Sequence, residues 1–371
     1  PAKMTMFYIT GHSLGAGDRG NKAASIKLDY GTGYSSDESN QGGHRGNVIN
    51  QLTDANIGNY GLGYGSSTRV PYIDAFSDST GVIGEDSGIA YEWHKQTGEK
   101  AWVINTAYGG TSLTGWAYNK TNYTFARSVY QKAEKIMNNE VLAGHFTLEH
   151  IFLINHSCAN GDGSWEIPTY YDAFNGMIEG FKNELKQNIG GVERTVDYVG
   201  LMPIIGVRGL SDSVYYDNAS AFQNGKSINY QMAYSSEYPD IFVASTLIRD
   251  LTDTRFNSLN DKPKPEIQQY FQQAYPNGID YQTHGTAVSL PTQTSQLIAD
   301  NCHPQQVTYN EEGRTIARSA AGFLNSHVAT DVKIYYGNDG RTYADGSYRL
   351  HVNKNESFTL LPFAIPSYAN N

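Results

Sequence analysis

Residues 7–15 read Phe-Tyr-Ile-Thr-Gly-His-Ser-Leu-Gly, a short apolar run that stops at a glycine and then presents a serine. Apolar residues that end abruptly in Gly-x-Ser-x-Gly are typical of a buried strand followed by a sharp turn, which exposes the serine hydroxyl at the carboxyl edge of a sheet. Ser13 is therefore a candidate nucleophile. Glycine-flanked serines also occur in ordinary loops, so the assignment depends on partners elsewhere in the chain.

The composition excludes several classes of partner. The chain has 371 residues, of which 39% are hydrophobic, enough to bury a sizeable core. The net charge is −10 with 17% charged residues, which argues against nucleic acid, because phosphate binding needs clustered Lys and Arg. The apolar stretches are too short for a membrane-spanning helix, and the N-terminus lacks a secretion signal. The chain starts at Pro1, as a piece of a longer polypeptide would.

Tyrosine and glycine are abundant, with 28 and 38 copies. Tyrosine among small polar residues makes rigid amphipathic surfaces, which suit the apolar faces and hydroxyl rims of sugar rings. A β-rich surface protein without a particular ligand has a similar composition. Two cysteines are too few for a disulfide scaffold.

Helical and strand patterns alternate from residue 84 onward, which predicts an α/β fold with a parallel central sheet and helices on both faces. The expected strands are 101–105, 150–154, 196–207 and 241–246, and the expected helices lie near 89–94, 124–139, 170–187, 228–235, 266–274 and 310–325.

Two regions depart from this alternation. Residues 15–70 are rich in Gly, Asn, Ser and Tyr, and we expect a long loop insertion that either walls a substrate site or only decorates the surface. Residues 329–371 alternate apolar and polar residues between Gly-containing turns, which predicts a small antiparallel β-rich extension. The main domain would therefore span 1–328.

Polar residues follow several of the predicted strands. These positions are the carboxyl ends of the strands, where ligands bind in an open parallel sheet. Together they supply the parts of acyl transfer: Ser13 would attack, His303 would take its proton, and Asp300 would orient the imidazole. A lone Asp-x-x-His is a weak signal, and His303 with Pro304 also fits a helix-entry turn. His284 is an alternative base, although no Asp lies three residues before it.

An oxyanion hole is expected from the same strand ends. Backbone N–H groups at Ser13 and in the Gly109-Gly110 turn, with a side-chain donor from Asn155 or His156, would bind the developing charge. The two glycines also fit a tight strand-to-helix connection, and Asn155 fits a helix cap. The order and position of all these parts favour the catalytic interpretation.

This set of motifs resembles the SGNH (GDSL-like) hydrolase superfamily, in particular its sialate O-acetylesterase and acetylxylan-esterase-like branch. The segment 105–116, with Ala-Tyr-Gly-Gly-Thr-Ser and Trp116, and the Asp-x-x-His-Pro segment 300–304 match that branch best. His12 and Leu14 stand where the branch has Gln and Asn beside the nucleophile. The resemblance implies a flavodoxin-like three-layer fold over residues 4–327.

The resemblance also implies details of the site. The third block of the branch normally supplies a Gln for the oxyanion hole; here Asn155 is the preferred substitute, with His156 second. Cys158 and Cys302 fall in the third and fourth blocks, which the fold would bring together, so they are candidates for a disulfide. No metal and no cofactor are implied.

From these observations we expect a serine O-acetylesterase that removes acetyl groups from a polysaccharide or oligosaccharide, with Trp116 and Trp165 as walls of the cleft. One alternative is a lipase of the α/β-hydrolase fold, although in that fold several strands precede the nucleophile. Another is a non-catalytic carbohydrate-binding domain that keeps an esterase-like fold.

The composition and the β-rich end also resemble the esterase part of a bacteriophage tail fibre or tailspike. That resemblance implies a homotrimer and a place on the virion surface, against an extracellular bacterial esterase as the other setting.

Overall fold

The structure is a computed structural model that describes residues 1–20, 26, 84–111, 113–144, 146–156, 167–202, 231, 234–248, 261–279, 290–299, 303–325, 329–335 and 361–366. Most of the predicted insertion 15–70 lies outside the described residues. So do five residues named in the sequence analysis: Cys158, Trp165, His284, Asp300 and Cys302.

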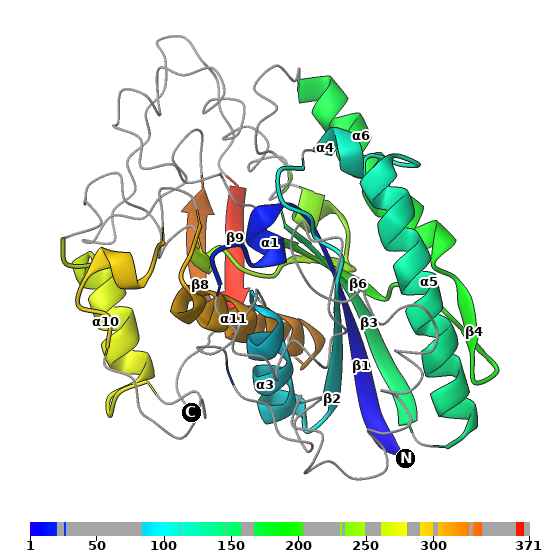
Figure 1. The fold of residues 1–371 in the computed structure, drawn as a ribbon, viewed down its shortest axis with the longest axis horizontal. Helices are drawn as coiled ribbons and strands as arrows, with labels where there is room; N and C mark the ends of the chain where they lie inside the picture. The colour runs from blue at the N-terminus through cyan, green and yellow to red at the C-terminus, as the bar shows by residue number, and fades with distance from the viewer. Residues whose placement is uncertain are drawn as a thin grey trace.

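A five-stranded parallel sheet forms the centre of the molecule (Figure 1). Its strands are β1 (Ala2–Thr10), β2 (Lys100–Asn105), β3 (Phe146–His156), β6 (Tyr198–Met202) and β7 (Ile241–Val243). The spatial order is β2-β1-β3-β6-β7, and every neighbouring pair is parallel. Numbered along the chain, these strands have the order 2-1-3-4-5 that flavodoxin-like folds share. The predicted α/β fold with a parallel sheet is confirmed.

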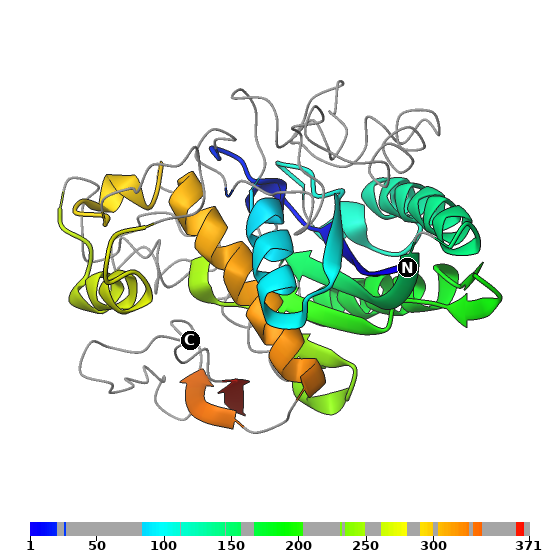
Figure 2. The same ribbon diagram turned by 90° about the horizontal axis from the view of Figure 1, so that it is seen from below.

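Helices cover both faces of the sheet, which gives three layers (Figures 1 and 2). One face carries α3 (Asp86–Thr97) and α11 (Gln306–Asn325), which pack against each other. The other carries α5 (Thr121–Leu142) and α6 (Ile167–Glu184). The shorter elements are α1 (Ser13–Ala16), α4 (Leu113–Trp116), α10 (Pro265–Ala274) and η4 (Thr294–Gln296).

The core is built on β1, which is buried continuously from Met4 to Thr10 because both of its faces are covered. Phe7 points to one layer, where its ring stacks on Phe152 at 5.0 Å and meets Trp93 of α3 edge-on at 5.2 Å. Tyr8 points to the other layer and stacks on Tyr130 of α5 at 4.1 Å. Burying these large aromatic side chains on both faces fixes the register of the central strand.

Two antiparallel pairs lie outside this sheet. The hairpin of β4 (Gln187–Ile189) and β5 (Val192–Arg194) follows α6. Near the end of the chain, β8 (Ala329–Tyr335) pairs with β9 (Leu361–Pro366), and β9 contacts α11. In the described part of the chain, no helix combines the length and the hydropathy that crossing a bilayer would require.

A buried ion network joins α3 to α11. Glu92 of α3 is fully buried and accepts hydrogen bonds from Arg314 at 2.8 Å and from Arg318 at 2.9 Å. Burial alone would raise the pKa of Glu92, but hydrogen bonds and charge from the two arginines outweigh it and lower that pKa to about 2. Because this pKa is below its unfolded value, the network stabilises the fold above about pH 4.5, and the stabilisation is lost as the pH falls toward 2.

We predict that Glu92→Gln lowers the free energy of unfolding by about 3–5 kcal/mol, because it leaves the buried guanidinium of Arg314 and the partly buried one of Arg318 without their carboxylate. Urea denaturation at pH 7 measures this change. Glu149→Gln is the matched control, since Glu149 meets Lys3 at 3.8 Å in an exposed pair and its loss should cost at most about 1 kcal/mol. Equal effects of the two substitutions would contradict the role of the network.

Candidate active site

The turn after β1 carries the predicted nucleophile. Gly11 follows the strand with φ +140°, a conformation that L side chains rarely adopt, and His12 then caps α1 by accepting a hydrogen bond at Nδ1 from the Leu14 N–H at 3.3 Å. Ser13 is the first residue of α1, so the helix offers no carbonyl acceptor for its N–H. The Gly-x-Ser-x-Gly stretch is thus a sharp strand-to-helix turn.

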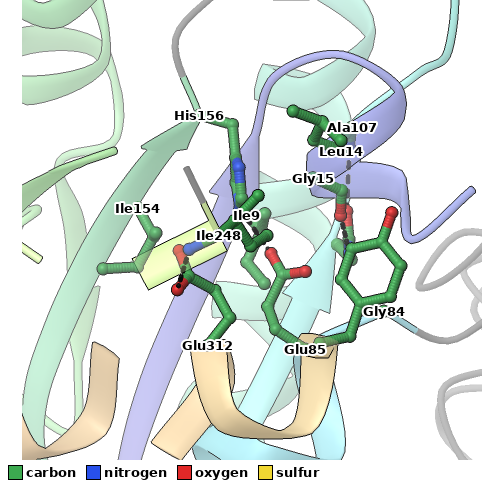
Figure 3. Close-up of polar contacts among 12 residues, drawn as sticks. Ile9, Leu14, Gly15, Gly84, Glu85, Ala107, Ile154, His156, Ile248 and Glu312 are labelled. Carbon is green, nitrogen blue, oxygen red and sulfur yellow. Dashed lines mark hydrogen bonds and ion pairs between the residues drawn. The ribbon is translucent and has the colours of Figure 1, made fainter. Parts of the chain in front are cut away.

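Both glycines of this motif are required by the close approach of β3. A Cβ on Gly11 would lie 2.4 Å from the Cβ of His156, and a Cβ on Gly15 would lie 2.9 Å from Cδ2 of the same ring. Figure 3 shows Gly15 on its turn beside the end of the strand that carries His156. The turn that presents Ser13 can therefore lie on the sheet only where these two positions lack side chains.

The structure brings Ser13 and His303 together from positions 290 residues apart, with His303 Nε2 3.0 Å from Ser13 Oγ. His303 precedes α11. Its carbonyl accepts a hydrogen bond from the Ala299 N–H at 2.8 Å, and a β-bridge joins Ile298 to the next residue, Pro304. Ser13 is 5% exposed and the His303 side chain 18%, so the pair lies at the edge of the interior, with the imidazole partly open to solvent. This is the nucleophile and base geometry of acyl transfer.

The glycine turn after β2 lies beside the Ser13 turn. The Tyr108 N–H donates to the Gly11 carbonyl at 3.0 Å, and the Thr111 hydroxyl donates to the Tyr108 carbonyl at 2.6 Å. Gly109 is buried, whereas Gly110 is exposed with φ +71°. Tyr108, which directly precedes the two predicted oxyanion glycines, therefore links their turn to the segment that carries Ser13.

The two candidate oxyanion side chains are used inside the protein. Asn155 is fully buried, and its amide nitrogen donates to Thr10 Oγ1 at 2.9 Å and contacts the sulfur of Met177 at 3.8 Å. His156 is also fully buried, with Nε2 2.6 Å from a carboxylate oxygen of Glu85. Both side chains point into the helix layers that cover the sheet, so neither is an oxyanion donor.

The expected role of Trp116 as a cleft wall also needs correction. The ring is fully buried, so it cannot contact a sugar, and its Nε1 donates to Thr111 Oγ1 at 3.0 Å. Trp116 therefore supports the loop that follows β2. Tyr108, on that same loop, is 38% exposed.

A buried layer of polar side chains lies under the Ser13 turn, and sequence reasoning missed it. Asn105 donates to the Gly15 carbonyl at 2.8 Å and to Asp86 at 3.0 Å. Glu85 meets His156 (Figure 3). In the sequence, the acidic pair Glu85-Asp86 follows Gly84 and looks like the usual charged start of a helix, so it gives no signal that it is buried. These contacts tie α3 and β2 to the nucleophile turn.

Burial sets the protonation of this layer. It raises the pKa of Glu85 well above its ordinary value, and burial together with the charge of Glu85 does the same for Asp86. Burial lowers the pKa of His156 to about 3. Burial therefore favours the neutral forms of both groups at this contact, in which the Glu85 carboxyl donates to His156 Nε2.

Metal chemistry has no candidate ligand set within the described ranges, where no group of three or more His, Cys, Asp or Glu side chains is arranged to hold an ion.

Comparisons with known proteins do not assign this chain to a family. No protein-family model matches the sequence, and no curated protein matches it. Among solved structures, a protein from Arabidopsis thaliana aligns over 88% of this chain and 100% of its own length, with 10% sequence identity and a TM-score of 0.41.

We predict that Gly15→Ala destabilises the protein by about 1–3 kcal/mol, because the new methyl group overlaps the buried ring of His156. Thermal unfolding measures the change. Gly176→Ala in α6 is the matched control, since its Cβ would lie 3.6 Å from the nearest atom and a helical alanine stabilises by up to about 1 kcal/mol. A stable Gly15→Ala variant would contradict the close packing.

A second prediction concerns pH. Because burial raises the pKa of Glu85 above its unfolded value of about 4.5, the unfolded chain releases this proton at lower pH than the folded protein, and the group makes the fold less stable as the pH rises. Glu85→Gln keeps a donor to His156 and removes that proton uptake. Above about pH 4.5, and until the pH passes the raised pKa of Glu85, the wild type should lose stability relative to Glu85→Gln by up to about 1.4 kcal/mol per pH unit.

Denaturation at several pH values measures this difference. Glu193→Gln on exposed β5 makes the same change of charge and should follow the wild type. Parallel curves for wild type and Glu85→Gln would show that the buried carboxyl does not hold its proton.

Proposed function

We propose that this protein is a serine O-acetylesterase of the SGNH type that deacetylates a polysaccharide or oligosaccharide. The observation that carries the proposal is the 3.0 Å contact between His303 Nε2 and Ser13 Oγ, at the carboxyl edge of a parallel sheet. The glycine turn beside it, with Gly110 exposed, supports a backbone oxyanion hole. Asp300 completes the proposed triad from sequence alone.

In the proposed reaction, Ser13 Oγ attacks the acetyl carbonyl as its proton moves to His303 Nε2. The N–H groups of Ser13 and Gly110 stabilise the oxyanion. The bond to the sugar oxygen then breaks, and that oxygen takes the proton from His303. Water then attacks the acetyl carbonyl as the same imidazole takes one of its protons. The bond to Ser13 Oγ breaks, acetate leaves, and the proton on His303 returns to Ser13 Oγ. No metal or cofactor takes part in this sequence.

The position of the nucleophile in the chain favours this class over a lipase. In the described sheet Ser13 follows β1, and both neighbours of β1 come later in the chain, whereas several strands and an oxyanion loop precede the nucleophile in an α/β-hydrolase. The acidic, tyrosine-rich composition supports a neutral sugar as substrate.

The proposed setting is extracellular or on a virion surface. If the chain belongs to a phage tail fibre, it should form a homotrimer, and a monomeric mass in solution would exclude that setting without affecting the esterase proposal.

Acetate release from a panel of acetylated polysaccharides, with p-nitrophenyl acetate as a general ester, tests the function. Ser13→Ala should lower the rate by at least about 1000-fold, because the acyl-enzyme route is lost. Ser128→Ala, on the exposed surface of α5, should not change it. The rate should fall at acidic pH as His303 gains a proton. Equal rates for wild type and Ser13→Ala would remove the enzyme hypothesis.

A further inference from the structure

A carboxylate that no sequence motif marks lies at the reacting nitrogen. Asp18 Oδ2 is 3.4 Å from His303 Nε2, the atom that also meets Ser13 Oγ at 3.0 Å. Both side chains of this ion pair are partly exposed, 18% for His303 and 20% for Asp18. The carboxylate is therefore at the open edge of the pair.

Asp18 is held in this position through both its backbone and its side chain. Its N–H donates to the Ser13 carbonyl at 2.9 Å, and its carbonyl accepts from the Tyr309 hydroxyl of α11 at 2.8 Å. Its other carboxylate oxygen accepts from the Arg19 N–H at 2.9 Å. The residue is thus fixed to the nucleophile turn and to the helix that follows the base.

The geometry assigns a role that differs from that of the triad acid. A triad acid binds Nδ1 and selects the tautomer, whereas Asp18 faces Nε2, where the proton arrives when it leaves Ser13. A negative charge at this distance favours the charged imidazole. We propose that Asp18 is a positioning residue that stabilises protonated His303 and keeps its Nε2–H on the side of the reacting groups.

The catalytic role of Asp18 rests on the proposed function, whereas its effect on the protonation of the His303 ring rests on geometry alone. In the acylation step, the Nε2 proton is shared between the imidazole and the sugar oxygen that will receive it. Asp18 attracts that proton during this interval and makes His303 a stronger base toward Ser13. It exchanges no proton with the substrate.

Other titratable groups lie on the segments that meet at the Ser13 turn. His12 caps α1, Arg19 follows Asp18 with an exposed side chain, and Glu85 and His156 lie beneath the turn. From α11, Tyr309 reaches the backbone of Asp18 rather than its carboxylate. Asp300, proposed for the other ring nitrogen, lies outside the described residues. Because all of these groups are the same in the wild type and in an Asp18 variant, comparing the two isolates Asp18.

The test is an NMR titration of the His303 ring in the full chain at low salt, with the signal assigned by its loss in His303→Gln. In Asp18→Asn, which keeps an oxygen for the Arg19 N–H, the half-titration pH should fall by about 0.5–1 unit. Asp18→Glu should recover part of the shift. Glu193→Gln, an equal change of charge on a distant exposed strand, should match the wild type.

The acid limb of kcat/KM should move to lower pH by the same amount in Asp18→Asn, which a merely structural role would not produce. Adding salt to the wild type should lower the half-titration pH in the same direction, and this arm does not depend on how any variant folds. Coincident titrations for wild type and Asp18→Asn, or no salt effect, would overturn the inference. A shifted titration in a protein that releases no acetate would instead overturn the proposed function.

Discussion

The close approach of the Ser13 turn to the end of β3 is the constraint on which the site depends. Gly11 and Gly15 leave room for the buried His156, and the ring of His156 is fixed in turn by the carboxyl of Glu85. Close-packed interiors do not deform smoothly, so the turn has one position on the sheet. Ser13 is consequently presented by packing and by buried hydrogen bonds rather than by a flexible loop.

His303 reaches this turn because α11 is attached to the same layer from the opposite end of the chain. Gln306, in the first turn of α11, donates to the Gly84 carbonyl at 2.8 Å, and Glu312 accepts from the Ser245 hydroxyl. Glu312 also accepts from the Ile248 N–H (Figure 3). Further along the helix, the arginines on Glu92 fix α11 to α3. Anchoring the helix along its length positions the imidazole that precedes it.

Much of the fold was predictable, because it follows from periodicity. Alternating helical and strand patterns predicted the parallel sheet, and the glycine spacing at 11–15 predicted the strand-to-helix turn. The hairpin of β4 and β5 was missed, because strands of three residues carry no periodic signal. The meeting of Ser13 and His303 was predictable from the rule that polar residues gather at the carboxyl ends of parallel strands.

The surroundings of the pair could not be predicted, because they depend on which face of an element is buried. Asn155 and His156 are adjacent on β3, and the sequence does not say that both side chains are used inside. Trp116 is of a residue type that suits stacking on a sugar ring, but its side chain is buried. Asp18 belongs to no motif, and its relation to His303 exists only once the two ends of the chain have met.

The central claim is that His303 activates Ser13, and covalent labelling tests it most directly. The wild-type protein would be treated with a fluorophosphonate, which reacts with activated serines, and the modified residue located by mass spectrometry. We expect one label per chain, on Ser13, and its loss in His303→Ala. Labelling that is absent from the wild type, or undiminished in His303→Ala, would contradict the account.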